Sequence, residues 1–336
     1  MKTHRGIARG LRNRAVSQGT IRVPAVPAML DEYVRICLST FSALGVEFDP
    51  EQVAKLRSVL DEQLIKAYEE SHRSEIVISY ESPIGDIVNY HVAPQWTSLD
   101  VSYDNWMATR QPPLFGTYPD ARVLALLEGL MDPASCHVLD LGAGTGRNAL
   151  ALARRGHPVD AVEITPSFAA VIREATQAES LDIRVYERDV FATIDDLRRD
   201  YGVIVLSEVV SDYRSLAELR STFEIAATCL APGGLLVFNA FLAADDFVPD
   251  EAARQWGQQT YSTIYTRSEV KAAVSGFPLT LLSDDSVYEF ERGHLPDEAW
   301  PPTGWYAHWV SGHDVFWLPR EESPIELRWQ VYRKAD

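Results

Sequence analysis

The feature that most constrains the fold is the segment Val138–Gly156, which reads VLDLGAGTGRNALALARRG. A short apolar run indicates a buried strand, and the apolar spacing after Gly146 is typical of a helix. Glycines between a strand and a helix let the backbone turn tightly and approach a ligand without an intervening Cβ atom. The segment therefore predicts a strand–turn–helix unit with a ligand at the carboxyl end of the strand.

The same alternation of strand-like and helix-like patterns continues along the rest of the chain. It is typical of an α/β fold with a parallel sheet and helices on both faces. The last two candidate strands are joined by a long segment without a helix of convincing length, which suits an antiparallel last strand. We therefore predict a doubly wound, seven-stranded, mostly parallel sheet. The expected strands are 137–141, 158–164, 183–189, 202–208, 233–241, 279–290 and 325–334.

A separate module is expected before the glycine-rich turn. Residues 28–45 and 49–71 have helical spacing, with Asp49 as an N-cap and Pro50 in the first turn. Two alternating runs within residues 75–92 indicate a β-hairpin. The predicted organisation is a flexible basic tail at 1–27, a helical and hairpin module at 28–112, and a main domain at 113–336 with insertions at 241–265 and 291–323.

Charge and cysteine content narrow the classes of function. The net charge is −17, and residues 1–27 hold six Lys or Arg and no acid, so the remainder carries −23. Such an acidic body repels phosphates, so we expect no nucleic-acid partner, although the basic tail alone could touch RNA or act in targeting. Cys37, Cys136 and Cys229 show no disulfide or metal spacing. We expect a cytoplasmic protein with no metal and no membrane association.

The acid before the glycine-rich turn distinguishes between cofactors. A G-x-G-x-x-G turn is typical of dinucleotides, whose pyrophosphate rests on the helix N-terminus. Here the glycines are Gly142, Gly144 and Gly146, and Asp140 lies on the strand just before them. A carboxylate at this place would repel a pyrophosphate and attract an ammonium group. The pattern disfavours a dehydrogenase and favours S-adenosylmethionine, which has an amino-acid end and a sulfonium but no phosphate.

The sequence from Val138 to Pro166 resembles the first motif and second strand of the class I S-adenosylmethionine-dependent methyltransferases. Its continuation GRNALALARRG is most similar to the small-molecule branch that includes the tellurite-resistance methyltransferases. The resemblance covers about residues 115–290 and the closing strand at 325–333, but not the N-terminal module. It implies a Rossmann-like fold, S-adenosylmethionine as cofactor, and transfer of a methyl group to a small-molecule acceptor.

The resemblance also implies cofactor contacts, residue by residue. Glu163, followed by Ile164, would accept hydrogen bonds from both ribose hydroxyls. Asp189 would contact the adenine amino group, with Val190 and Phe191 beside the ring. The other expected cofactor-binding residues are Asp140, Gly142, Ala143, Gly144, Thr145, Gly146, Asn148 and Ser207.

The exit of the fourth strand is expected to face the acceptor. Glu208, Asp212 and Tyr213 are the candidate catalytic residues there, although Ser211 and Asp212 could instead cap the next helix. A general base is needed only when the acceptor must first lose a proton. No His follows this strand, so the sequence gives no sign of a metal-and-histidine arrangement.

Both insertions are expected to close the site. The first contributes Tyr261 and the second contributes Trp305 and Tyr306 as candidate substrate-binding residues. The alternative for the aromatic residues of the second insertion is a packed secondary core under a long loop.

Two other functions remain open at this point. Glu208 and Glu218 resemble the paired acids of protein arginine methyltransferases, with a similar but different spacing, so an arginine or amine N-methyltransferase is one alternative. The other is a non-catalytic cofactor-binding or partner-binding module. The N-terminal module could cover the substrate, dock a second subunit in a homodimer, or pack on the sheet.

Overall fold

The computed structural model describes residues 2–12, 16–82, 87–98, 101, 103, 109, 113–128 and 132–336. The chain divides into two compact units. The first comprises Met1–Ser102 and Asp250–Gln259, and the second comprises Tyr103–Pro249 and Thr260–Asp336. Within the described residues, no helix has the length and apolar character needed to cross a membrane.

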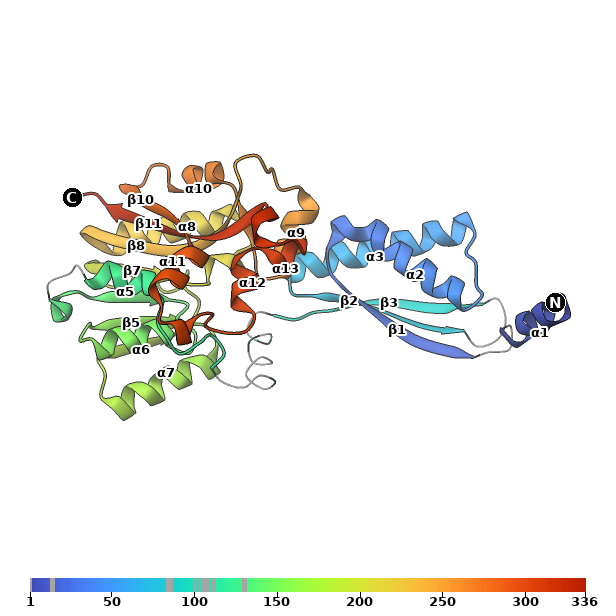
Figure 1. Cartoon of the computed structure of the whole chain (residues 1–336), viewed down its shortest axis with the longest axis horizontal. Helices are drawn as coiled ribbons and strands as arrows, with labels where there is room; N and C mark the ends of the chain where they lie inside the picture. The colour runs from blue at the N-terminus through green and yellow to red at the C-terminus, as the bar shows by residue number, and fades with distance from the viewer. Residues whose placement is uncertain are drawn as a thin grey trace. The chain divides into compact units, whose positions relative to one another are not determined.

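The first unit is a three-stranded antiparallel sheet with two helices packed against it (Figure 1). A reciprocal capping box between Asp49 and Gln52 starts the longer helix, which confirms the predicted N-cap. Phe41, Leu60 and Ile76 are fully buried in the core between helices and sheet. The elements are α1 (Lys2–Arg12), β1 (Ser17–Pro24), α2 (Leu30–Ala43), α3 (Pro50–Glu70), β2 (Glu75–Ser82) and β3 (Asn89–Gln95).

The expectation of a flexible tail over residues 1–27 is wrong for the strand β1. Its eight residues pair with β2, from Ser17 opposite Ser82 to Pro24 opposite Glu75. Alternation places Ile21 and Val23 on the face that packs against the helices. The predicted hairpin of β2 and β3 is confirmed, and its turn at 83–86 lies outside the described residues.

Part of the insertion predicted at 241–265 belongs to the first unit. Helix α9 (Glu251–Gln259) packs Trp256 against the core of that unit. The Gln255 side-chain oxygen accepts the Ala28 N–H at 2.8 Å, and Arg73 donates to the Gln258 carbonyl at 2.5 Å. Instead of forming a lid made only of main-domain residues, this stretch completes the core of the N-terminal module.

The sheet of the second unit has the order β10-β11-β8-β7-β4-β5-β6, and the two-residue β9 pairs with β8. Strand β11 is antiparallel to both of its neighbours, and the other pairs are parallel. The predicted mostly parallel sheet with an antiparallel last strand is therefore confirmed, and the short β9 adds an eighth strand to the seven that were predicted. The strands are β4 (Val138–Leu141), β5 (Val159–Glu163), β6 (Ile183–Glu187), β7 (Tyr201–Leu206), β8 (Leu230–Ala243), β9 (Ile264–Tyr265), β10 (Leu279–Ser286) and β11 (Ile325–Lys334).

Helices cover both faces of this sheet. On β11, Trp329 donates to Glu291 on one face, whereas Tyr332 packs against Phe223 on the other face. The helices are α5 (Ala121–Glu128), α6 (Arg147–Arg154), α7 (Pro166–Glu179), α8 (Leu216–Cys229), α10 (Arg267–Val274), α11 (Val287–His294), α12 (Tyr306–Val310) and α13 (His313–Phe316). The 3-10 turns are η1 (Pro27–Met29), η2 (Pro133–Ser135), η3 (Ile194–Asp196), η4 (Val210–Asp212), η5 (Asp297–Ala299) and η6 (Arg320–Glu322).

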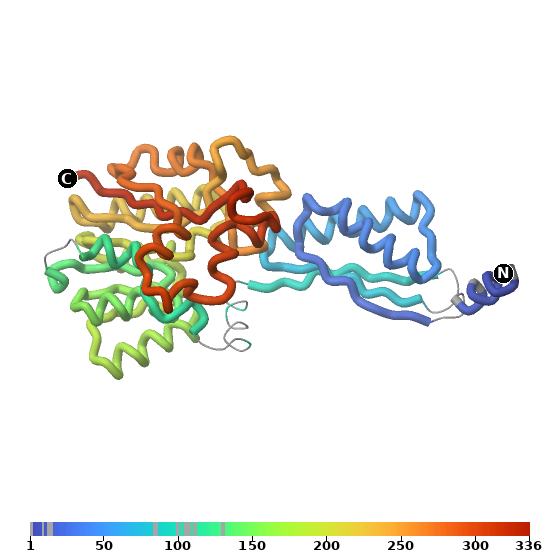
Figure 2. Tube along the Cα trace, in the orientation of Figure 1, coloured from blue at the N-terminus to red at the C-terminus, as the bar shows by residue number. Residues whose placement is uncertain are grey.

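The strand predicted at 279–290 ends earlier than expected. Ser286 accepts the Glu289 N–H and starts α11 at Val287. The connection between β10 and β11, coloured orange to red in Figure 2, runs from α11 through α13. The Glu291 carboxylate on α11 accepts the Ala121 N–H at 2.7 Å, so the second insertion is anchored to the start of α5.

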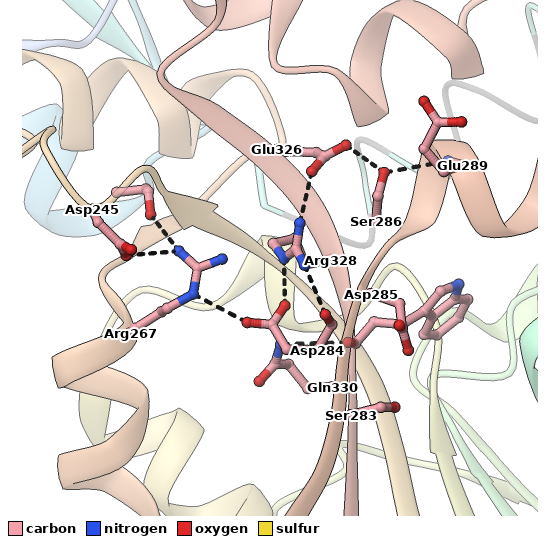
Figure 3. A network of polar contacts seen from close by, with 12 residues as sticks. Asp245, Arg267, Ser283, Asp284, Asp285, Ser286, Glu289, Glu326, Arg328 and Gln330 are labelled. Atoms are coloured by element: carbon pink, nitrogen blue, oxygen red, sulfur yellow. Dashed lines mark hydrogen bonds and ion pairs between the residues drawn. The ribbon is translucent and has the colours of Figure 1, made fainter.

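A chain of ion pairs fixes β10 and β11 to the start of α10 (Figure 3). Arg267 pairs with Asp245 and Asp284, and Arg328 pairs with Asp284 and with Glu326. A cavity of about 370 Å³ beside it is lined by Arg267 and Arg328, among others. Because these guanidinium groups already have carboxylate partners, we assign the network a structural role.

Candidate functional site

The glycine-rich turn has a backbone that only glycine adopts without strain. Gly142, Gly144 and Gly146 have φ values of +72°, +58° and +88°. A Cβ atom on Gly142 would lie 2.4 Å from Cγ2 of Val209, so a larger residue would also clash. The turn between β4 and α6 therefore lies directly against the chain that leaves β7. Ala143 and Thr145 complete the turn.

Asp140 brings a buried carboxylate to this turn. Its side chain is 2 % exposed, its carboxylate is hydrogen-bonded by the Ala149 backbone of α6, and its Oδ2 atom has no hydrogen-bond partner. Burial, followed by the nearby Asp120, raises the pKa of Asp140 to about 7. A buried carboxylate oxygen without a partner is unfavourable unless a ligand satisfies it. The ammonium group of S-adenosylmethionine fits this requirement.

Glu163 lies on the other side of the turn, at the end of β5. Its carboxylate accepts the N–H groups of Gly144 and Thr165, each at 2.7 Å. A carboxylate has acceptor positions beyond these two, so it can also accept from ribose hydroxyls. The next residue, Ile164, is 42 % exposed and offers an apolar surface beside it.

The residues expected around the adenine follow β6. Asp189 is exposed, and its side chain accepts the Phe191 N–H at 2.7 Å. Val190 and Phe191 are half-buried and pack against the main core. The carboxylate of Asp189 has acceptor positions beyond this one bond, and its contact with the adenine amino group stays a prediction.

An ion-pair network that the sequence analysis missed joins the turn to β7. Arg147 donates to Asp120 at 2.6 Å and to Glu208 at 2.7 Å. Ser207, expected to touch the cofactor, lies 3.3 Å from the same guanidinium. Asn148 holds Asp120 through both ends of its amide, at 2.8 and 3.0 Å. Asn148 thus anchors the start of α5, and its amide is engaged there instead of facing the turn.

Glu208 occupies a strained position at the exit of β7. Its φ of +62° lies in the left-handed region, which a residue other than glycine adopts only when its surroundings enforce it. Its N–H donates to Oδ1 of Asn239 at 2.7 Å, while Nδ2 of that fully buried amide has no partner. Burial raises the pKa of Glu208 to about 7, although Arg147 acts in the opposite direction. Strain of this kind is frequent at functional sites.

Tyr213 and Asp212 differ in their surroundings. The Tyr213 hydroxyl is within 2.7 Å of Thr222 Oγ1 in the core, and burial raises its pKa, so its position suits packing more than proton transfer. Asp212 is half-buried, and its Oδ2 accepts the Tyr103 hydroxyl at 2.6 Å.

The N-cap of α8 is Ser215, not Ser211 or Asp212. Ser215 and Glu218 form a reciprocal capping box. The Glu218 carboxylate also accepts the Arg214 N–H at 2.7 Å. Glu218 is thereby committed to the helix N-terminus, while Glu208 is paired with Arg147. The structure does not bring these two acids together as a clamp for a guanidinium group.

Among the residues that the structure describes, four aromatic side chains form a cluster beside the turn, called the aromatic cluster below. The centroid of Tyr103 is 5.6 Å from Phe168 and 6.4 Å from both Phe115 and Tyr261. The Phe115 ring is 3.7 Å from the position of a Cβ atom built on Gly144. The predicted substrate-binding residue Tyr261 therefore belongs to a cluster that reaches the cofactor turn.

The second insertion brings its aromatic residues to the same region. Trp309 donates to the Tyr261 carbonyl at 3.0 Å. Tyr306 is fully buried, and its hydroxyl has no hydrogen-bond partner. Trp305 is half-buried, with its centroid 5.9 Å from that of Tyr306. Glu208 raises the pKa of Tyr306, after the larger effect of burial, so the two side chains are electrostatic neighbours.

Residues 138–234 match the family model described as a methyltransferase domain. The chain carries a class I S-adenosylmethionine-dependent methyltransferase domain. The match begins at β4 and includes the glycine-rich turn, Glu163, Asp189 and Glu208. It does not single out the tellurite-resistance branch.

Two curated relatives share part of the methyltransferase domain. Hemagglutinin 1 of Eikenella corrodens is 35% identical over 122 residues, covering 36% of this chain and 40% of the relative. Malonyl-[acyl-carrier protein] O-methyltransferase of Geobacter sulfurreducens is 32% identical over 181 residues, covering 50% and 65%. The chain thus spans less than two thirds of the curated relatives it matches.

A solved structure confirms the fold of the methyltransferase domain. It is described as that of a "putative sarcosine dimethylglycine methyltransferase" from Galdieria sulphuraria. The TM-score is 0.50 at 18% identity, and the superposition covers 70% of this chain and 98% of that chain. At this identity the likeness shows the Rossmann-like fold alone.

Proposed function

We propose that the protein transfers a methyl group from S-adenosylmethionine to a small-molecule acceptor. The observation that carries this proposal is the buried, unpartnered Oδ2 of Asp140 beside the glycine-rich turn of the matched domain. When bound, S-adenosylmethionine supplies a methyl group that its sulfonium already activates.

The cofactor side of the site comes from the ends of β4, β5 and β6. In this proposal, Asp140 holds the ammonium group and Glu163 holds the ribose hydroxyls. Asp189, Val190 and Phe191 hold the adenine ring. Because Gly142 and Gly144 have no side chains, the backbone of the turn can approach the ligand closely.

The acceptor side comes from the exit of β7 and from the second insertion. Glu208 and Asp212 supply carboxylates, while Tyr261 and the buried Tyr306 supply aromatic walls. Walls of this kind exclude water and align the acceptor, and alignment accounts for a large part of the rate when the methyl group is already activated.

The first experiment is a calorimetric titration of the wild-type protein with S-adenosylmethionine and, separately, with NADH. We expect binding of S-adenosylmethionine only. Asp140→Asn and Glu163→Ala should each weaken it about tenfold or more, because each removes a charged hydrogen-bond partner. Glu224→Gln, a change of equal charge at an exposed position, is the matched control. Unchanged affinity in both site variants would contradict the proposed cofactor site.

The second experiment asks what receives the methyl group. The protein is incubated with methyl-labelled S-adenosylmethionine and a cell extract, and the label is sorted by molecular size. Label in the small-molecule fraction is the expected result. The Geobacter relative is named for an acceptor on an acyl-carrier protein, so label confined to macromolecules would contradict a free small-molecule acceptor.

A further inference from the structure

We propose that two copies of this chain associate, with the basic helix α1 of one copy docked on an exposed apolar patch in the second unit of the other. The patch, called the Trp317 patch below, consists of Val248 and Trp317 together with the ring pair of Phe247 and Phe316. The helix and the patch carry opposite charge, and each has apolar side chains that a single chain leaves exposed.

The Trp317 patch exposes two large apolar side chains. Val248 is 81 % exposed and Trp317 is 77 % exposed. The residues just before them, Phe247 and Phe316, join the two segments, since their ring centroids lie 5.6 Å apart. Trp317 also has a φ of +54°, in the left-handed region that is unfavourable for residues other than glycine. A strained, exposed tryptophan beside a second exposed apolar side chain is typical of a binding surface.

The charge around the patch favours a cationic partner. The segments that carry it, 244–249 and 313–322, contain five acids and one arginine. That arginine, Arg320, is already paired with Glu289. Asp246, Glu321 and Glu322 are exposed and form no ion pair within the part of the chain that the structure describes. Their charge can attract a basic partner, whereas it repels the same patch of another copy.

Helix α1 matches the patch in charge and in apolar character. Its sequence, KTHRGIARGLR, contains four Lys or Arg and no acid. Ile7 and Leu11, one turn apart on the helix, are 59 % and 68 % exposed. A helix of eleven residues is marginal on its own in water, and Gly6 and Gly10 weaken it further. An apolar surface that covers Ile7 and Leu11 would therefore stabilise the helix.

The charge of the rest of the chain selects a second copy as the partner. Without the six Lys and Arg of residues 1–27, the net charge of −17 becomes −23. A body this acidic repels an anionic membrane or a nucleic acid that approaches α1, but it attracts α1 of another copy. Docking within one chain would cover Ile7 and Trp317, yet both are exposed in the structure of one chain. Two copies can form two equivalent contacts, each between α1 of one protomer and the Trp317 patch of its partner.

The test is the oligomeric state of the full-length protein, measured by sedimentation velocity over a hundredfold range of concentration that reaches about 100 μM. We expect a dimer that dissociates on dilution and at high salt, because the contact is partly electrostatic. Trp317→Ser and the double substitution Ile7→Asp with Leu11→Asp should each raise the dissociation constant about tenfold or more. Trp96→Ser, at another exposed tryptophan, is the matched control and should leave it unchanged.

A mixture of the two interface variants distinguishes the proposed contact from other dimers. Each mixed pair retains one intact α1 and one intact patch, so a labelled Trp317→Ser protein should bind the Ile7→Asp, Leu11→Asp protein more tightly than either variant binds itself. No gain in the mixture would overturn the inference, since it would indicate contacts of α1 with α1 or of patch with patch.

Two results with the wild-type protein would also overturn the inference. One is a protein that stays monomeric at the highest concentration. The other is a monomer that binds vesicles containing phosphatidylserine and loses this binding in the Ile7→Asp, Leu11→Asp variant, which would assign α1 to a lipid surface. Both interface variants should bind S-adenosylmethionine as the wild type does, so failure of the proposed function would be seen separately.

Discussion

Asp140 is the residue whose protonation should control cofactor affinity. Burial and Asp120 raise its pKa to about 7, with a smaller contribution from Glu163, while the Ala149 backbone and Arg147 lower it. Only the ionised carboxylate attracts an ammonium group. We therefore predict that the affinity for S-adenosylmethionine falls about tenfold from about pH 8 to about pH 6, as the ionised fraction falls. Calorimetric titration across this range measures the effect.

The Asp140→Asn variant is the control for this pH dependence. Its weaker affinity should change little over the same range, and an equally steep profile would assign the titration to another group. In the free protein, the stability changes with pH in the opposite direction to the cofactor affinity. Because the folded state raises the pKa from 3.8, Asp140 lowers the free energy of unfolding as pH rises from about 4 to about 7.

Arg147 is the residue on which the buried network depends. Arg147→Met would leave Asp120 and Glu208 without their cation, and removing one partner of a buried pair costs about 3–5 kcal/mol. The pKa of Glu208 is already about 7 and would rise further in the variant, so protonation should reduce this cost at about pH 6. Denaturant unfolding of the wild type and the variant at about pH 8 and at about pH 6 measures the difference.

Arg154→Met is a matched control on the same helix, since its pair with Glu179 is half exposed. Exposed pairs of this kind contribute about 0–1 kcal/mol. Equal losses of unfolding free energy in the two variants would contradict the structural importance of the Arg147 network.

At the scale of elements, the sequence predicted those helices and strands whose pattern lies within a few neighbouring residues. The strand–turn–helix unit from β4 to α6 and the capping box of α3 are encoded within a few neighbouring residues. Helix α11 was missed although its Ser286 and Glu289 have the spacing of a capped helix start. The apolar run before Ser286 dominated the interpretation, so the strand was extended too far.

Elements whose position depends on residues far away in the chain could not be predicted from a local sequence pattern. Helix α9 is polar, and its place is decided by Trp256 and by contacts with residues far earlier in the chain. The site divides in the same way. Asp140 and Glu163 follow from the motif spacing, whereas the pairing of Arg147 with Glu208 spans 61 residues. Nothing in the spacing of a single sequence indicates such a pair.

At the scale of the whole molecule, the two units share the chain in an interleaved order. The chain leaves the second unit after Pro249, and residues 250–259 complete the core of the first unit. The chain then returns to the second unit at Thr260. The first unit therefore needs a segment that lies within the sequence of the second. Arg73, which is buried, helps to hold this segment by donating to the carbonyls of Gln258 and Gln259.

This arrangement leads to a prediction about the independence of the two units. Arg73→Met should destabilise the first unit by about 2 kcal/mol, because two carbonyls lose a charged donor. Hydrogen exchange should then become faster in β1, β2 and α9, while the affinity for S-adenosylmethionine stays unchanged. Arg57→Met, which breaks an exposed pair with Asp31 in the same unit, should cost less than about 1 kcal/mol. Loss of cofactor affinity in Arg73→Met alone would instead show that α9 couples the N-terminal unit to the methyltransferase site.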